Sequence, residues 1–240
     1  IYSLRAGVGE KLQPYVELAE FTINESPESI LEGIWKRQPK VIGFSCYIWN
    51  WKLIREILTE LPKILPDTEI WLGGPEVTYD GPGLLREFPQ VTGIMVGEGE
   101  VTFREVLDHY VREAESTGQS EQQPEPDRIE QQAADRAGTV AGKSVAERFG
   151  QIPGLCLASG YTAPRELTDL TTLPFLYEDM EPFTNRIIYY ETSRGCPYRC
   201  SYCLSSIDKK VRLRDIDVVK RELQFFLDQN VKQVKFIDRT

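Results

Sequence analysis

Short apolar runs alternate with helical segments through the first 111 residues, and this rhythm is the strongest constraint on the fold. The runs 41–47, 69–72 and 93–96 predict strands, and each is followed by apolar residues recurring at helical spacing. A nearly continuous apolar run such as 41–47 is typical of a strand covered on both faces, as in a parallel sheet. The alternation therefore predicts a Rossmann-like, doubly wound parallel α/β sheet, in which ligands bind beyond the carboxyl ends of the strands.

Local signals predict where several elements begin and end. Ser26-Pro27-Glu28 predicts the start of a helix, and Asp215 predicts the cap of another. Pro62 and Pro66 predict the end of the helix that follows the run 41–47. Val16–Phe21 alternates apolar and charged residues, which predicts a further strand.

Residue composition and the predicted elements divide the sequence into four parts. Residues 1–111 form the α/β domain, and residues 112–150, rich in Gln, Glu, Ser and Ala, predict a flexible linker or insertion. Within the latter, Arg128–Ala137 predicts a weakly stable helix. Residues 151–186 are expected to be a connecting segment that includes a short strand at 152–158. Residues 187–240 predict one strand–loop–helix–strand unit, which opens a second domain.

Charge and hydropathy restrict the partners. Lys and Arg total 28 and Asp and Glu total 37, a net charge of −9, so the chain is a poor general binder of phosphate backbones and nucleic acid is not an expected partner. We expect no membrane span, because no apolar run approaches the roughly 18 residues required. Residues 1–7 do not predict a signal peptide. The expected location is the cytoplasm.

Three cysteines form the motif that carries chemistry. Cys196, Cys200 and Cys203 are spaced C-x3-C-x2-C, directly after a predicted strand, Ile187–Thr192. Thiolate sulfur suits iron–sulfur clusters and zinc. A short loop with these gaps can hold three corners of a [4Fe–4S] cluster and leave the fourth iron open. The motif therefore predicts a metal site, with an iron–sulfur cluster as the favoured occupant.

Zinc is the alternative, and it requires a fourth ligand. No second C-x2-C is present, and Cys46 and Cys156 stand alone in predicted strands, where buried cysteine is common. The single histidine, His109, lies on a predicted helix and is interpreted as a surface residue. A non-catalytic corrinoid- or partner-binding module with a structural zinc knuckle remains the second hypothesis.

The stretch Gly195–Cys203 resembles the signature of the radical S-adenosylmethionine (radical SAM) enzymes. The resemblance implies that residues 187–240 begin a (β/α) partial barrel and that the three cysteines hold a [4Fe–4S] cluster. The open iron would bind S-adenosylmethionine, and the reduced cluster would cleave it to methionine and a 5′-deoxyadenosyl radical. That radical would abstract hydrogen from a small-molecule substrate.

The same resemblance assigns further residues. Tyr202 would lie against the adenine of S-adenosylmethionine. Phe236 and Asp238, at the end of the next predicted strand, would approach its methionine amino group. An electron donor such as flavodoxin or ferredoxin is implied as a partner. The resemblance assigns no catalytic side chain.

Stretches at the predicted strand ends resemble a radical SAM subclass with a cobalamin-binding domain; they are 41–45, 72–76 and 96–100, with a connector at 169–175. The resemblance covers most of the chain except 112–150 and implies cobalamin at these strand ends. Glycine there lets the backbone approach a flat macrocycle, although tight turns would also explain it. The residues implied are Ser45, for the nucleotide tail, and Gly73, Gly74, Gly97, Glu98 and Gly99.

The chain departs from that subclass in two respects. It has no Asp-x-His-x-x-Gly motif to supply a lower cobalt ligand, and the strand that usually opens such a domain is not found before residues 4–12. Some members do not use cobalamin. The resemblance implies radical methylation, cyclisation or rearrangement. Within the subclass, the sequence is similar to those of proteins grouped with the anaerobic magnesium-protoporphyrin monomethyl ester cyclase. Because further barrel strands would follow Thr240, we expect residues 1–240 alone to cleave little S-adenosylmethionine.

Overall fold

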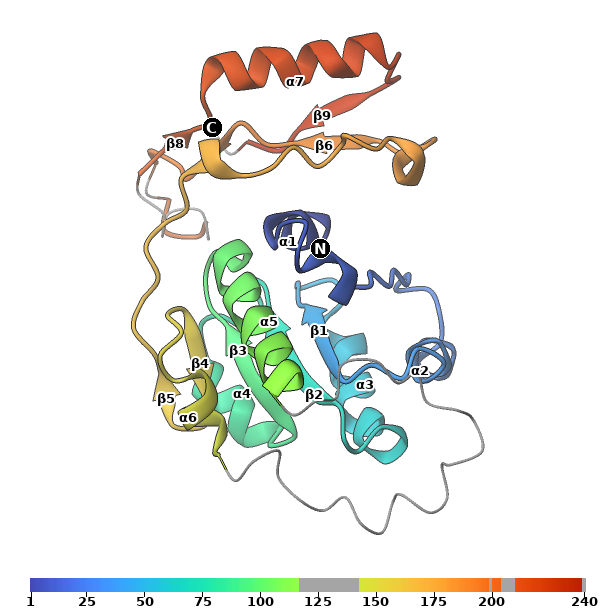
Figure 1. Ribbon diagram of the computed structural model, residues 1–240, viewed down its shortest axis with the longest axis vertical. Coiled ribbons are helices and arrows are strands. Elements are labelled where there is room, and N and C mark those ends of the chain that lie inside the picture. Colours follow the sequence, from blue (N-terminus) through green and yellow to red (C-terminus); the bar gives the residue numbers. More distant parts are fainter. Residues whose placement is uncertain (117–142, 199, 204–209, 239–240) are drawn as a thin grey trace. The chain divides into compact units, whose positions relative to one another are not determined.

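The chain divides into two compact units. The computed structural model describes residues 1–116, 143–198, 200–203 and 210–238. Unit 1 is Ile1–Glu166 and unit 2 is Leu167–Thr240 (Figure 1). The boundary therefore falls inside the expected connecting segment, residues 151–186. The helix expected at Arg128–Ala137 lies outside the described residues.

Unit 1 is built on a five-stranded sheet in the order β1-β2-β3-β4-β5. The strands are β1 (Val41–Ser45), β2 (Glu69–Gly73), β3 (Val91–Met95), β4 (Leu155–Leu157) and β5 (Gly160–Tyr161). The first three are parallel, as predicted, whereas β4 is antiparallel to β3 and β5 is antiparallel to β4. The strand expected at 152–158 thus extends this sheet and is not part of a connector.

Helices cover both faces of the sheet, which confirms the doubly wound α/β prediction (Figure 1). One face packs against α2 (Pro27–Trp35), α3 (Trp51–Ile64) and α4 (Gly81–Glu87), and the other against α5 (Gly99–Ser116) and α6 (Val145–Phe149). Ile70 and Leu72 of β2 face the first group, and Trp71 faces the second, because side chains alternate along a strand. The short α1 (Tyr2–Gly7) packs on α5.

The edge strand differs from its prediction. β1 was expected to be covered on both faces, yet its residues are half-buried and Gly43 is exposed. The reason is its position at the end of the strand order, where it has one neighbour, β2. An apolar run does not distinguish a central strand from an edge strand.

Local signals were mostly confirmed. Ser26 begins α2 by accepting a hydrogen bond from the backbone N–H of Ser29, at 3.2 Å. The strand predicted at Val16–Phe21 is wrong: this segment has no strand partner and follows a 3₁₀ turn, η1 (Gln13–Tyr15). The Phe21 ring packs instead beside Gly33 of α2, so alternation there reflects contact with a helix.

Pro62 lies inside α3, although it was expected to end that helix. A proline at this position cannot donate a hydrogen bond to the carbonyl four residues earlier, that of Leu58. The side chain of Gln90 donates to this carbonyl oxygen at 2.8 Å. Gln90, which directly precedes β3, therefore supplies the missing donor, and the helix continues to Ile64.

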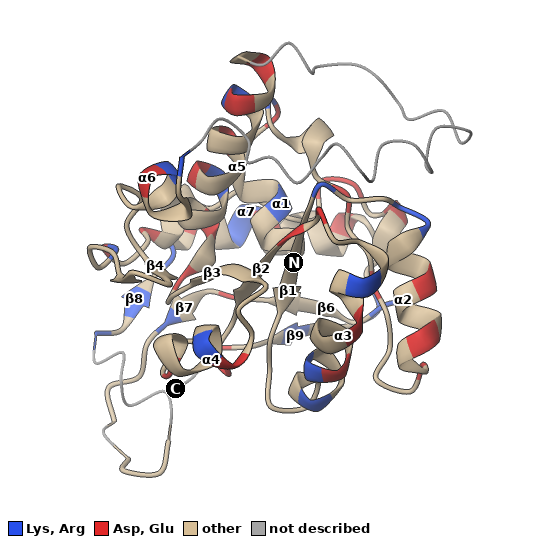
Figure 2. Ribbon diagram, turned by 90° about the horizontal axis from the view of Figure 1, so that it is seen from below, with Lys and Arg blue, Asp and Glu red and all other residues tan. Residues whose placement is uncertain are grey.

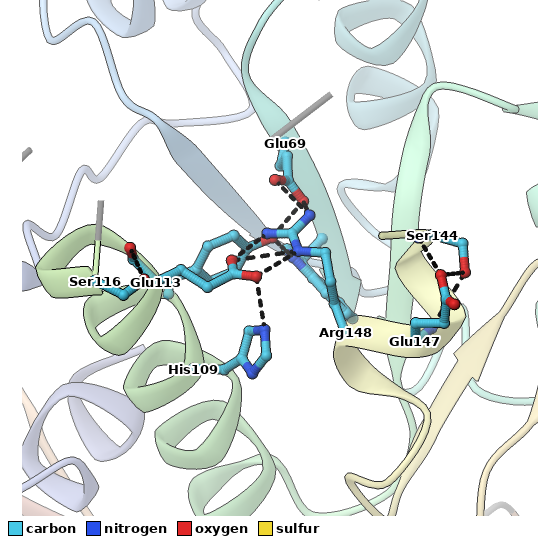
Figure 3. Close-up of polar contacts among 9 residues, drawn as sticks. Glu69, His109, Glu113, Ser116, Ser144, Glu147 and Arg148 are labelled. Carbon is cyan, nitrogen blue, oxygen red and sulfur yellow. Dashed lines mark hydrogen bonds and ion pairs between the residues drawn. The ribbon is translucent and has the colours of Figure 1, made fainter. Parts of the chain in front are cut away.

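A buried arginine ties α6 to the sheet (Figure 3). The side chain of Arg148 is only 8% exposed, and its guanidinium donates to Glu69 at 2.9 and 3.0 Å and to Glu113 at 2.8–3.2 Å. Glu69 begins β2 and Glu113 lies near the end of α5. His109 Nε2 lies 3.0 Å from Glu113 Oε1, so His109 is part of this cluster rather than a simple surface residue.

Aromatic rings enclose the same cluster. The hydroxyl of Tyr110 donates to Glu69 at 2.6 Å and accepts from Trp71 Nε1 at 2.8 Å. The Arg148 guanidinium lies 5.2 and 4.7 Å from the ring centroids of Tyr110 and Phe149. Burial raises the pKa of Tyr110 and keeps it protonated. Burial disfavours the charge of Arg148, but its bonds to Glu113 and Glu69 outweigh that cost and raise its pKa.

Unit 2 contains the predicted strand–loop–helix–strand order. Strands β6 (Ile188–Tyr190) and β9 (Val234–Phe236) are parallel, and α7 (Ile216–Asp228) connects them. Asp215 caps α7 by accepting from the backbone N–H groups of Asp217 and Val218, as predicted. Such a strand–helix–strand crossover is the repeating element of a (β/α) barrel. A second, antiparallel pair joins β7 (Ser193–Arg194) to β8 (Arg212–Leu213).

None of the helices among the described residues has the length and apolarity that crossing a membrane would require.

Replacing Arg148 with Met should destabilise unit 1 by about 2–3 kcal/mol, because two partly buried carboxylates lose their partner. The four tryptophans, Trp35, Trp49, Trp51 and Trp71, all lie in unit 1, so urea unfolding followed by tryptophan fluorescence isolates its transition. Arg112→Met is the control, since Arg112 pairs with Asp108 on the surface and should change stability by less than about 0.5 kcal/mol.

The loss caused by Arg148→Met should shrink in acid. Burial acts to raise the pKa of Glu113, but the bonds to Arg148 outweigh burial and hold it below its usual range. A lowered carboxyl pKa contributes stability that is present above its unfolded value, roughly 4.3, and is lost as the pH falls through the folded value. Equal losses for the two variants at pH 7 would contradict the assigned role of Arg148.

Candidate functional site

The loops that follow the three parallel strands of unit 1 meet at one edge of the sheet. In the strand register Ser45 pairs with Gly73, and Gly73 pairs with Met95. The N–H of Cys46 donates to the Gly73 carbonyl at 2.7 Å, and the N–H of Glu76 donates to the Cys46 carbonyl at 3.3 Å. The structure therefore brings Ser45, Gly73 and Gly74 together, at the edge where ligands bind in such folds.

Gly74 is required by its close contact with the neighbouring loop. Its φ is +107°, and a Cβ at this position would lie 2.5 Å from the backbone oxygen of Cys46. Gly97 also has a positive φ, +81°, but a Cβ there would meet no atom within 4 Å. The tight-turn reading thus accounts for Gly74, while Gly97 lies exposed beside open space.

The remaining predicted residues of this edge have different surroundings. A Cβ at Gly99 would lie 3.1 Å from the side chain of Leu4, so Gly99 faces α1. Gly73 lies in the sheet beside Met95, and Glu98 is half-buried between Gly97 and Gly99. Of this group, Gly97 is the residue whose surroundings are open.

Exposed aromatic and apolar side chains at the strand ends were not predicted as site residues. Ile48 is 80% exposed and Trp49 is 64% exposed, both in the loop after β1, and Tyr79 is exposed in the loop after β2. The rings of Tyr47 and Trp49 are stacked, with centroids 4.5 Å apart and planes at 11°. Large apolar groups left exposed together indicate a binding surface. The signal in the sequence was the aromatic run directly after an apolar strand.

Two of the five cysteines are unsuited to hold a metal. Cys46 and Cys156 are fully buried in unit 1. Burial raises the pKa of the Cys46 thiol to about 12 and also raises that of Cys156. Metal ligation requires the thiolate, so both residues act as small apolar groups. Their burial is the outcome expected from the sequence.

The motif cysteines lie in the loop between β7 and β8. Cys196, Cys200 and Cys203 are all partly exposed, and none of the chain's five cysteines is in a disulfide. The N–H of Cys203 donates to the carbonyl of Cys200 at 3.1 Å, which makes a turn within the motif. Within the part of the chain that the structure describes, no three His, Cys, Asp or Glu side chains are gathered as a ligand set. The donor chemistry of three thiols on one loop suits an iron–sulfur cluster.

The other residues predicted for S-adenosylmethionine lie around this loop. Tyr202 is 91% exposed, so its ring is open to a ligand. Phe236 ends β9 and meets Tyr190 edge-on, with centroids 5.8 Å apart. Asp238 lies at the entry to the loop, where it accepts hydrogen bonds from the N–H groups of Thr192 and Ser193, each at 2.7 Å.

Figure 2 shows acidic residues along α2 and residues of both signs along α3.

Residues 6–107 match the sequence profile of the family described as the B12 binding domain. The chain is 28% identical over 212 residues to a protein named cobalamin-dependent radical SAM methyltransferase TokK, from Streptomyces tokunonensis; the match covers 84% of this chain and 27% of the relative. The chain is thus similar to a cobalamin-dependent radical SAM protein, and residues 6–107 match the B12-binding domain.

Other relatives carry different named activities. A 2-(S-pantetheinyl)-carbapenam-3-carboxylate methyltransferase from Streptantibioticus cattleyicolor is 26% identical, over 89% of this chain and 30% of the relative. An anaerobic magnesium-protoporphyrin IX monomethyl ester cyclase from Rubrivivax gelatinosus is 22% identical, over 85% of this chain and 34% of the relative. The chain thus spans about a third or less of the length of these relatives.

A solved structure shows the same fold. The apo form of the cobalamin-dependent S-adenosylmethionine radical enzyme OxsB aligns with a TM-score of 0.62 at 18% identity, covering 98% of this chain and 31% of that one. Within the B12-binding region 6–107 lie all the strand-end residues predicted for cobalamin, together with Trp49 and Tyr79. The chain's single histidine, His109, lies outside that region and in the Arg148 cluster (Figure 3).

Gly74→Ala should destabilise unit 1 by at least ~2 kcal/mol, because it adds left-handed strain to an overlap with the backbone of Cys46. Gly43→Ala is the matched control: Gly43 is exposed on the edge strand β1 with open space around it, and alanine should be neutral or slightly stabilising. Tryptophan fluorescence during urea unfolding measures both. A neutral Gly74→Ala would contradict the contact between the two loops.

Proposed function

We propose that the chain forms part of a cobalamin-dependent radical SAM enzyme that transfers a methyl group to a small molecule. The observation that carries this proposal is the presence, in one chain, of a B12-binding domain and a C-x3-C-x2-C loop set on a strand–helix–strand unit. Two relatives named as methyltransferases favour methyl transfer over the cyclisation suggested by the cyclase.

In the proposal, the thiolates of Cys196, Cys200 and Cys203 bind three irons of a [4Fe–4S] cluster, and the exposed ring of Tyr202 covers the adenine of S-adenosylmethionine. When bound, the cluster supplies the electron that cleaves S-adenosylmethionine, and cobalamin supplies a methyl carrier. An electron donor such as flavodoxin or ferredoxin completes the set of partners.

Cobalamin is proposed to lie on the strand-end loops of unit 1. Gly97 offers backbone without a side chain, and the stacked pair Tyr47 and Trp49 offers a flat apolar surface that is already ordered. An ordered aromatic surface loses little conformational freedom on binding. Ser45 lies at the end of β1, next to Gly73, and remains the candidate for the nucleotide tail. Since His109 belongs to the Arg148 cluster, the corrin is proposed to bind without an imidazole from this chain.

Anaerobic reconstitution tests the cluster. We expect about four iron and four sulfide per chain, as a [4Fe–4S] centre requires, and near loss of both when Cys196, Cys200 and Cys203 are replaced by Ala together. Cys156→Ala is the control, because its buried thiol is not a ligand, and it should leave the iron content unchanged. One zinc and no iron would instead support a structural zinc knuckle. Undiminished iron in the triple variant would contradict the proposed ligands.

Titration with hydroxocobalamin, followed by absorbance, tests the surface of unit 1. Trp49→Ala should weaken binding about tenfold, because an exposed aromatic platform is removed. Trp35→Ala is the matched control, since Trp35 is also exposed but lies on α2, away from the loops that follow the strands. Failure to bind hydroxocobalamin, or equal weakening by the two variants, would reject this placement.

A further inference from the structure

The cysteine loop leaves and re-enters unit 2 through a two-stranded neck. In this neck Ser193 pairs with Leu213 and Arg194 pairs with Arg212. Gly195 has φ +92°, and a Cβ there would lie 2.3 Å from the backbone oxygen of Lys210. The three motif cysteines all come between Gly195 and Lys210, so they belong to one loop closed at its base.

The exit strand of the neck is anchored by buried charges. The Arg214 guanidinium, only 8% exposed, donates to Glu222 of α7 at 2.5 Å and to the Leu173 carbonyl at 2.9 Å. Glu222 also accepts from the hydroxyl of Tyr190 at 2.5 Å. Arg212 donates to the carbonyl of Thr168 at 2.7 Å. β8 is thereby held to α7, to β6 and to the segment beside η4 (Leu170–Thr172).

The entry strand is held by one carboxylate. Asp238 Oδ1 accepts from the N–H groups of Thr192 and Ser193, each at 2.7 Å, and Oδ2 accepts from the Thr192 hydroxyl at 2.5 Å. Asp238 comes just after β9, and the N–H of Ile237 donates to the Tyr190 carbonyl at 3.0 Å. Because β6 and β9 are parallel, their carboxyl ends lie side by side, which puts Asp238 at the point where the chain turns from β6 into the loop.

Both carboxylate oxygens of Asp238 are therefore engaged by the chain itself. Hydrogen bonds from backbone N–H groups to a carboxylate are charge-assisted and stronger than neutral ones. An ammonium group approaching Asp238 would compete with three donors that belong to Thr192 and Ser193. These contacts favour a role for Asp238 in holding the local backbone over a role in binding a ligand.

We propose that Asp238 is a positioning residue of the cysteine loop. Asp238 fixes the direction in which β7 leaves β6, and so the place of Cys196. The proposal rests on the proposed function in so far as the loop holds a cluster. The three hydrogen bonds that Asp238 accepts from Thr192 and Ser193, here called the clasp, are a property of the chain alone. A loop whose base is fixed beforehand loses less conformational entropy when its thiolates bind metal. Loss of the clasp should therefore lower metal loading without removing any ligand.

The first test measures the clasp in the full chain without iron or S-adenosylmethionine. Amide hydrogen exchange at Thr192 and Ser193, followed by NMR, should become at least about tenfold faster in Asp238→Ala. Asp238→Asn, whose side-chain oxygen still accepts, should give a smaller increase, and Thr192→Val should remove the hydroxyl contact alone. The control Asp228→Asn, on the exposed end of α7, should leave these amides unchanged.

The graded variants also separate a local effect from unfolding. Exchange at the Tyr190 amide and through α7 should stay slow in Asp238→Asn and Thr192→Val. Unchanged exchange at Thr192 and Ser193 in Asp238→Ala would overturn the proposal.

The second test measures iron bound after anaerobic reconstitution. Iron content should fall severalfold in Asp238→Ala and less in Asp238→Asn, in the same order as the exchange rates. If exchange accelerates but neither wild type nor variant takes up iron, the clasp is supported and the proposed cluster fails. If exchange and iron are both unchanged while S-adenosylmethionine binding weakens, Asp238 is a ligand residue and the positioning role is overturned.

Discussion

Parallel pairing of strands is the constraint on which both proposed sites depend. In unit 1 it brings the loops after β1, β2 and β3 to one edge, and in unit 2 it brings the end of β6 beside the end of β9. Backbone contact between Cys46 and Gly74, and the hydrogen bonds that Asp238 accepts from Thr192 and Ser193, are direct consequences. The glycine-bearing loops and the cysteine loop thus occupy equivalent positions on two separate α/β elements.

Buried arginines hold the parts that short strands cannot hold alone. β4 and β5 have three and two residues, and β7 and β8 have two each, which is too short for independent stability. Arg148 ties α6, just before β4, to the start of β2 and to α5. Arg214 ties the segment after β8 to α7. Arg148 is matched by two carboxylates, and Arg214 by Glu222 and main-chain carbonyls, so each buried guanidinium holds a fixed geometry.

The fold was largely predictable, and its exceptions share a physical cause. Strands β1, β2, β3, β6 and β9 and the caps of α2 and α7 follow from patterns a few residues long. The failures at Val16–Phe21 and Pro62 arise where a distant group intervenes: the Phe21 ring packs on α2, and Gln90 supplies a donor to the Leu58 carbonyl. The antiparallel placement of β4 likewise joins residues far apart in the chain, since Ile94 pairs with Cys156.

The sequence alone determined the alternation of strands and helices, the spacing of three thiols and the glycines at strand ends, because each is encoded by neighbouring residues. Only the tertiary structure decided that Trp49 is exposed and that Asp238 accepts hydrogen bonds at the entry to the cysteine loop. The contacts that only the tertiary structure shows join residues far apart in the chain: 79 positions separate Arg148 from Glu69, and 46 separate Asp238 from Thr192. Such pairs depend on how whole elements pack, and no local pattern of residues specifies that packing.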